Sequence, residues 1–178
     1  MADKKTSGQD SLGGTETPSP PTHGSLNTLL PVIRTFSPDD YLAARKLWEV
    51  TPGVGLSCAD EQEPIRHFLA RNPGLSFVAE EDGRLVGTIL CGNDGRRGLI
   101  HHLVTAPAAR RRGIGRELLR KGLVALRSQC IQKCHLLVFR SNADGLAFWR
   151  AVQASERNEL ALFSIETESA ASQVSRAK

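Results

Sequence analysis

The chain has 178 residues, of which 40% are hydrophobic and 24% charged, so it is long enough for one domain with a buried core. No segment approaches the roughly 18 consecutive apolar residues of a membrane-spanning helix, and the N-terminus lacks the apolar stretch of a signal peptide. Four cysteines are too few for a disulfide scaffold. These features exclude membrane insertion, and we expect a cytoplasmic protein with reduced thiols.

The net charge of +4 is unevenly distributed along the chain. Residues 96–140 contain eleven basic residues and one acidic residue, whereas the remainder of the chain is net acidic. Such a concentration of positive charge favours a polyanionic ligand: nucleic acid, an anionic membrane or a small molecule with several phosphates.

Both ends of the chain differ in composition from its middle. Residues 1–30 are rich in Gly, Ser, Thr and Pro and contain almost no large apolar side chain before Leu26, which is typical of a disordered tail. Residues 167–178 are small and polar, and we expect them to be frayed. The folded domain is therefore predicted to span residues 31–166.

The domain is predicted to begin with a strand and two helices. Residues 32–36 form the strand, and the sequence Ser-Pro-Asp-Asp at 37–40 is a helix start with a capping serine. The first helix places four apolar or aromatic residues on one face: Tyr41, Ala44, Leu47 and Trp48. We interpret Tyr41 and Trp48 as packing residues. The second helix is predicted over residues 60–71.

The pattern then changes to that of strands joined by tight turns. We predict strands over residues 75–80, 85–91 and 98–105, because apolar runs alternate there with two turns centred on Asp-Gly pairs. Consecutive strands joined by such turns are antiparallel.

The last part of the domain is predicted to return to a strand–helix–strand pattern. A loop rich in arginine and glycine opens a helix, followed by a strand at 134–139, a helix at 142–152 and a strand at 160–165. This order predicts an α/β (mixed α+β) domain. Its central sheet would be mixed and largely antiparallel, with six to seven strands and about four helices.

The loop between residues 106 and 116 has the composition of an anion-binding site. Successive N–H groups in a glycine-rich turn, together with the free amides of a helix N-terminus, favour negative charge. Gly113 and Gly115 lack a Cβ, so a pyrophosphate can approach the backbone closely. The sequence matches neither the Gly-Lys-Ser/Thr nor the Gly-x-Gly-x-x-Gly phosphate loop.

The run from Leu103 to Leu119 is similar to the signature of the GNAT superfamily of acyl-CoA-dependent N-acetyltransferases. The core of that signature is Arg/Gln-x-x-Gly-x-Gly/Ala after a strand, and Arg110, Gly113 and Gly115 fill its fixed positions. The predicted order of elements also matches the family's sheet. Residues 92–98 further resemble those of a small bacterial branch, the YpeA-like acetyltransferases.

The resemblance implies acetyl-CoA as a co-substrate and no metal. Backbone groups of the strand that ends at Thr105 would pair with the pantetheine arm, and the loop amides would hold the pyrophosphate with arginine side chains adding charge. Asn142 matches a position that often contacts the cofactor. The implied cofactor-binding residues are Leu103, Val104, Thr105, Arg110, Arg111, Arg112, Gly113, Ile114, Gly115, Arg116 and Asn142.

Acyl transfer needs a proton donor for the departing thiolate. Many relatives use the Tyr of a Phe-Tyr-x-x-x-Gly-Phe motif, but here Trp149 stands at that position and the Gly-Phe pair is absent. An indole N–H donates a hydrogen bond but is not a useful acid. The thiolate therefore leaves through water or another donor, or the chain is catalytically weak.

The residue that accepts the proton of the attacking amine is also not determined by the motif. Some relatives place a base Glu on the fourth strand, where this chain has Leu99. His101 faces the same side by the two-residue period of a strand and is our candidate base. A bulge in this strand would exchange His101 with His102. The alternative is that both are ordinary strand histidines.

Two other functions, zinc binding and nucleic-acid binding, agree less well with the sequence. The cysteines and histidines of residues 101–135 follow no compact zinc-ligand spacing. The basic segment contains one aromatic residue, Phe139, and no nucleic-acid-binding motif. We therefore expect neither a metal nor a nucleic acid as the main ligand, and no membrane partner.

Together these features predict an N-acetyltransferase that moves acetyl from acetyl-CoA to a primary amine by direct attack in a ternary complex. The alternative is a catalytically weak CoA-binding module that serves in sensing or interaction. The sequence does not identify the acceptor amine, and it is compatible with a monomer or a homodimer.

Overall fold

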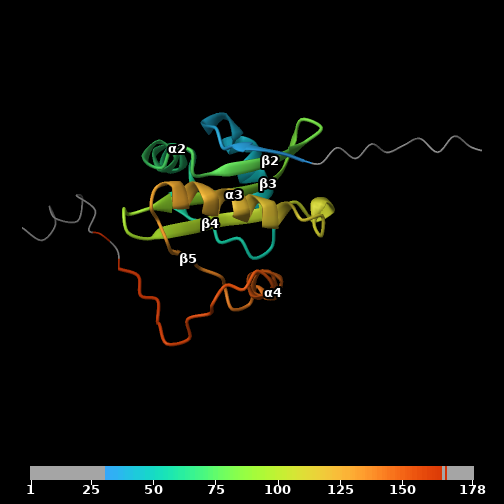
Figure 1. Cartoon of the computed structure of the whole chain (residues 1–178). Coiled ribbons are helices and arrows are strands. Elements are labelled where there is room, and N and C mark those ends of the chain that lie inside the picture. The colour runs from blue at the N-terminus through green and yellow to red at the C-terminus, as the bar shows by residue number, and fades with distance from the viewer. Residues whose placement is uncertain (1–30, 166, 168–178) are drawn as a thin grey trace, which may run out of the picture.

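A computed structural model describes residues 31–165 and Thr167 (Figure 1). The predicted tail 1–30 and all of the predicted tail 167–178 except Thr167 lie outside the described residues. The helices and strands are β1 (Val32–Thr35), α1 (Tyr41–Glu49), α2 (Gln62–Arg71), β2 (Phe77–Glu81), β3 (Arg84–Asn93), β4 (Gly98–Thr105), α3 (Ile114–Ser128), β5 (Cys134–Leu136) and α4 (Ala143–Ala151). Three 3₁₀ helices lie between them: η1 (Pro38–Asp40), η2 (Cys58–Asp60) and η3 (Pro107–Ala109).

The strands form one sheet in the order β1-β2-β3-β4-β5. Neighbouring strands are antiparallel except β4 and β5, which are parallel. The predicted α/β class with a mixed, largely antiparallel sheet and four α-helices is therefore confirmed. The predicted count of six to seven strands is wrong for the described residues, which contain five.

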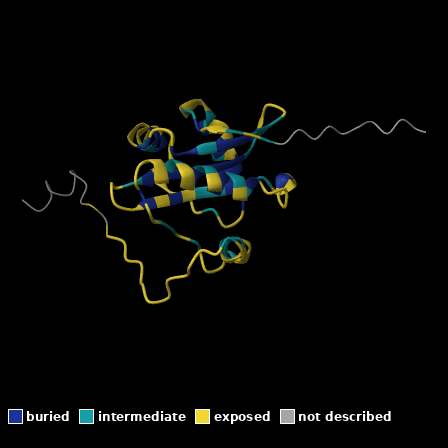
Figure 2. Cartoon of the chain, viewed as in Figure 1, coloured by how far each residue is buried: buried dark blue, intermediate teal, exposed yellow. Residues whose placement is uncertain are grey.

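The predicted strand at 160–165 is absent. This segment runs away from the sheet (Figure 1), and its large apolar side chains are at least 60% exposed (Figure 2). An apolar sequence favours a strand only where a neighbouring strand supplies hydrogen bonds and packing, and 160–165 has no such neighbour among the described residues. The strand predicted at 134–139 is likewise shorter, because its pairing with β4 ends at Leu136.

Helices cover both faces of the sheet (Figure 1). On one face α3 contributes Leu118 to an apolar cluster that includes Ile89 of β3. On the other face α1 and α2 contribute Trp48 and Ile65 to a second cluster that includes Leu90. Adjacent residues of β3 thus serve opposite cores, which is why its sequence is apolar nearly throughout.

Local sequence sets where the first helix begins. The Ser37 hydroxyl accepts a hydrogen bond from the Asp39 amide, and the Asp40 carboxylate accepts one from the Ser37 amide at 2.8 Å. This reciprocal cap satisfies two amides that a helix start leaves free. The first turn is 3₁₀, so the α-helix itself begins at Tyr41.

A buried hydrogen-bond chain joins α1 to β3 and β4. The Trp48 indole donates to Thr88 Oγ1 at 2.9 Å, and the Thr88 hydroxyl donates to the His102 carbonyl at 2.9 Å. Trp48 and Tyr41 are 1% and 8% exposed, which confirms their predicted packing role. Thr88 is fully buried, so no water replaces its hydroxyl in either bond.

We predict that Thr88→Val lowers the free energy of unfolding by about 2 kcal/mol, because it leaves the Trp48 indole without an acceptor and the His102 carbonyl without this donor. Urea denaturation followed by tryptophan fluorescence measures the loss. Thr35→Val, at an exposed position of β1, is the matched control and should change stability by less than about 0.5 kcal/mol. Equal stabilities of the two variants would contradict the role of this hydrogen-bond chain.

Candidate active site

The loop before α3 presents a row of free backbone amides. Gly113 precedes the helix with a φ of +82°, and Arg111 has a φ of +62°. From Arg111 to Arg116, no amide donates a hydrogen bond within the described residues. Free amides at a helix N-terminus, together with the helix dipole, attract an anion. We call residues 110–116 the anion loop.

The arginine side chains of the anion loop differ in what they contact. Arg112 forms a two-point ion pair with Glu81, with Nη1 2.9 Å from Oε2. Arg110 Nη1 lies 3.6 Å from the Asp144 carboxylate. Arg111 makes no ion pair with a described residue. Part of the positive charge that the sequence concentrates here is therefore balanced by acidic residues from other segments.

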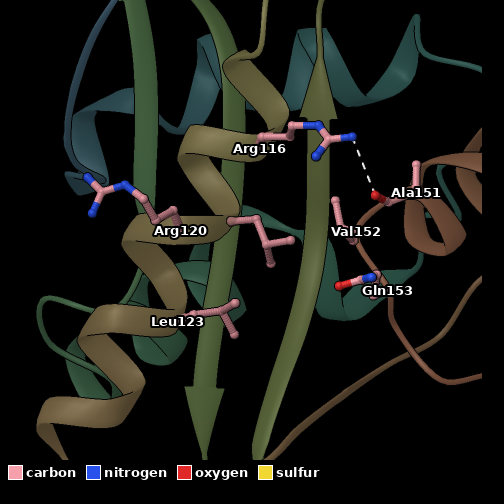
Figure 3. A pocket seen from close by; sticks show the side chains of 7 residues that line it. Arg116, Arg120, Leu123, Ala151, Val152 and Gln153 are labelled. Carbon is pink, nitrogen blue, oxygen red and sulfur yellow. Dashed lines mark hydrogen bonds between the residues drawn. The ribbon is translucent and has the colours of Figure 1, made fainter.

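A hollow lies along α3 beside the anion loop (Figure 3). Arg116 reaches across it and donates a hydrogen bond to the Ala151 carbonyl at the end of α4, with a distance of 3.4 Å. The lining residues are Arg116, Leu119, Arg120, Leu123, Ala151, Val152 and Gln153.

A gap between β4 and β5 opens toward the anion loop. The two strands pair only from Gly98 to Ile100 of β4, so Leu103, Val104 and Thr105 have no strand neighbour on the β5 side. Thr105 Oγ1 lies 3.5 Å from the position that a Cβ on Gly115 would occupy, so the end of β4 lies against the first turn of α3. The gap therefore leaves one edge of β4 available to an extended ligand.

Asn142 joins the start of α4 to the loop after α1. Its Oδ1 accepts a hydrogen bond from the Gly145 amide at 2.8 Å, which caps α4, and its Nδ2 donates to the Gly53 carbonyl at 3.3 Å. Gly53 has a φ of +84°, and a Cβ there would lie 2.4 Å from Nδ2. The loop after α1 thus reaches α4 only because residue 53 is glycine.

A bulge in β4 places both histidines on one face of the sheet. His101 pairs with Leu90, and Val104 pairs with Thr88, so one extra residue of β4 lies between these pairs. His102 has a φ of +44°, in the left-handed region. As a result His101 contacts Phe68 of α2 and His102 contacts Trp48 of α1, on the same face.

His102 is paired with Asp60. Its Nε2 lies 2.6 Å from Asp60 Oδ1, and the two side chains are only 11% and 15% exposed. The imidazole also packs against Trp48, with ring centroids 4.5 Å apart. We did not predict a role for Asp60 from the sequence beyond starting a helix. The only local signal is the Ser57-x-x-Asp60 spacing of a capping box, which does not reveal a contact with residue 102.

His101, the sequence candidate for the base, lies at the surface of the same face. Its ring packs edge-on against Phe68, with centroids 6.0 Å apart. Desolvation by neighbouring atoms, with a smaller contribution from His102, lowers the pKa of His101 below its usual value. A histidine in this environment is neutral at physiological pH and has a free lone pair.

Trp149 lies on α4, half-buried against the edge of Phe148, with ring centroids 5.2 Å apart. The indole N–H has no hydrogen-bond acceptor among the described residues, and both side chains pack against the α3-side core. Trp149 thus supplies packing and one free hydrogen-bond donor.

The cysteines are dispersed in this structure. Cys91 is buried under α3, and burial raises its pKa to about 12. Cys58 and Cys130 are exposed, and Cys134 is half-buried.

Among the described residues, no three His, Cys, Asp or Glu side chains are arranged to hold a metal ion. No helix of this part of the chain has the length and apolarity to cross a membrane.

Comparisons with known proteins agree with this geometry. The model of the acetyltransferase (GNAT) family matches residues 42–153. An acetyltransferase of Photorhabdus laumondii is 33% identical over 131 residues, which cover 71% of this chain and 88% of that protein. An acetyltransferase of Pectobacterium atrosepticum is 34% identical over 110 residues, covering 62% of this chain and 77% of that protein.

The fold is also that of solved acetyltransferases. The crystal structure of PaiA N-acetyltransferase from Thermoplasma acidophilum in complex with coenzyme A aligns with a TM-score of 0.61 and 22% identity, covering 70% of this chain and 89% of that one. Since the family model matches more than half of the chain and the bacterial relatives share about a third of the aligned residues, the chain belongs to the GNAT family of acetyltransferases.

Proposed function

We propose that this N-acetyltransferase holds acetyl-CoA, its co-substrate, between the anion loop and the gap beside β4. The amides from Arg111 to Arg116 bind the pyrophosphate, and the free edge of β4 pairs with the pantetheine arm. The observation that carries this proposal is the row of free amides at the start of α3, next to an unpaired strand edge. Arg110 and Arg111 add positive charge at the loop, and Asn142, which joins α4 to the loop after α1, contacts the cofactor.

The acetyl group passes directly to a primary amine in a ternary complex. The amine nitrogen attacks the thioester carbon, the C–S bond breaks, and the thiolate leaves with the bonding electrons. A histidine of the β4 bulge accepts the amine proton. His101 and His102 both fit this role by position, because the bulge turns them to one face.

The departing thiolate takes its proton from water. Trp149 occupies the position where relatives place a tyrosine, and its indole N–H is not an acid at physiological pH. The free N–H is compatible with a hydrogen bond to the leaving sulfur but not with proton donation.

We also place the chain in the small bacterial YpeA-like branch of the family. The support is the sequence of the β3–β4 turn and the identity of 33–34% with acetyltransferases of Photorhabdus and Pectobacterium. The acceptor is a primary amine, which a panel of a polyamine, an aminoglycoside, a free amino acid and a peptide with a free N-terminus would sample.

Gly113→Val should weaken acetyl-CoA binding at least tenfold in calorimetry. A β-branched residue does not readily adopt a φ of +82°, so the loop amides would turn away from the pyrophosphate. Gly95→Val is the matched control, because Gly95 has a φ of +85° in the β3–β4 turn and, like Gly113, has open space around it. Equal affinities of the two variants would refute the loop as the phosphate site.

Trp149→Phe should keep turnover within about threefold of the original chain, because the phenyl ring preserves the packing on Phe148 and no proton donor is lost. Thiol release from acetyl-CoA, with the amine of the panel that is acetylated fastest, measures this. A tenfold or greater loss, with acetyl-CoA affinity unchanged, would show that the indole takes part in the chemical step.

A further inference from the structure

We propose that His102 and Asp60 form the catalytic base of this enzyme as a dyad. His102 Nδ1 accepts the proton of the acceptor amine, and Asp60 is the positioning residue that fixes the imidazole. The proposal rests on the acetyl transfer proposed above and assigns its proton acceptor.

The hydrogen bond between the two side chains determines the tautomer of His102. Burial alone would raise the pKa of Asp60, but hydrogen bonds from His102 and Ser57 outweigh it and hold that pKa below its ordinary value. The ionised carboxylate only accepts hydrogen bonds, so Nε2 of His102, 2.6 Å from Oδ1, must carry a proton. In the one-proton tautomer that a base requires, the lone pair of the ring is then on Nδ1.

Asp60 is itself held in place by other contacts. Its Oδ2 accepts hydrogen bonds from the Ser57 amide at 2.7 Å and the Ser57 hydroxyl at 3.2 Å, in the capping box of η2. Its carbonyl accepts one from the Tyr41 hydroxyl and one from Arg45, each at 3.1 Å. Each carboxylate oxygen thus has a separate partner, and the one that faces His102 has no freedom to turn away.

The backbone of His102 is held in a conformation that costs energy. A left-handed φ is uncommon for a non-glycine residue, and such strain persists only where the surrounding structure enforces it. Here Thr88 Oγ1 donates to the His102 carbonyl, and Trp48 packs against the ring. Backbone, ring plane and tautomer of this one residue are therefore all specified.

The nitrogen that this arrangement leaves unpaired is Nδ1, on a side chain that is 11% exposed. Nδ1 of His102 has no hydrogen-bond partner among the described residues. Every side-chain nitrogen or oxygen that is buried in the described part of the chain has a partner, so Nδ1 is not sealed in the core. His102 lies just beyond Ile100, the last residue of β4 that pairs with β5, where the gap begins.

The proton and electron balance is complete with these groups. The amine nitrogen forms a bond to the thioester carbon as its proton moves to Nδ1, and the C–S electrons leave on the thiolate, which takes a proton from water. The resulting imidazolium is stabilised by the Asp60 carboxylate and returns its proton to solvent. The other titratable or charged groups around the pair are His101 on β4 and Tyr41 and Arg45 on α1.

Asp60→Asn tests the positioning role. An asparagine that donates its amide N–H to Nε2 forces the His102 proton onto Nδ1 and removes the acceptor. We expect kcat/KM at pH 7 to fall about 100-fold, as in His102→Ala, with the loss in kcat rather than in KM. Acetyl-CoA affinity should stay within about twofold. His67→Gln, at an exposed histidine of α2 paired with Glu63, is the control and should keep the original kcat and KM.

Nitrogen-15 NMR of the histidine rings gives a readout that does not need an acceptor amine. The original chain should show His102 protonated at Nε2 and free at Nδ1, and Asp60→Asn should reverse this. Protonation at Nδ1 in the original chain would overturn the dyad. So would Asp60→Asn retaining half of the original kcat. Acetyl-CoA binding without turnover of any amine in the panel would overturn the dyad alone, whereas no acetyl-CoA binding would also overturn the proposed function.

Discussion

The bulge in β4 is the constraint on which the rest of the candidate site depends. It turns His102 to the α1 and α2 face just beyond Ile100, the last residue of β4 that pairs with β5. The buried Thr88 hydroxyl holds the carbonyl of the bulge, and Trp48 holds both that hydroxyl and the imidazole. The same buried cluster therefore packs the core and orients the His102 side chain. A change in the core of α1 would also disturb the site.

The charge distribution of the chain also gains a physical meaning from the fold. Four arginines of the basic segment, at positions 110, 111, 112 and 116, lie at the N-terminus of α3, but Arg112 is paired with Glu81 and Arg110 lies near Asp144. The free amides of the anion loop and Arg111 are the donors that remain for an anion. Backbone geometry therefore matters at least as much as net charge for phosphate binding here.

The features that were predicted correctly from the sequence are those that depend on local patterns of residues. The turns at the two Asp-Gly pairs, strand 98–105 and the helix after the glycine loop follow from periodicity and from residues with special backbone preferences. The segment at 160–165 was assigned wrongly, because an apolar pattern does not show whether a neighbouring strand exists. Asp60 was missed because its contact with His102 spans 42 residues and arises only when η2 packs over the bulge.

Binding of acetyl-CoA at the anion loop is the central claim, and amide hydrogen exchange followed by NMR tests it most directly. With acetyl-CoA, the amides from Arg111 to Arg116 should exchange more slowly, because they now donate to the pyrophosphate, while those of the β3–β4 turn should not change. Unchanged exchange in the anion loop at saturating acetyl-CoA would contradict the account.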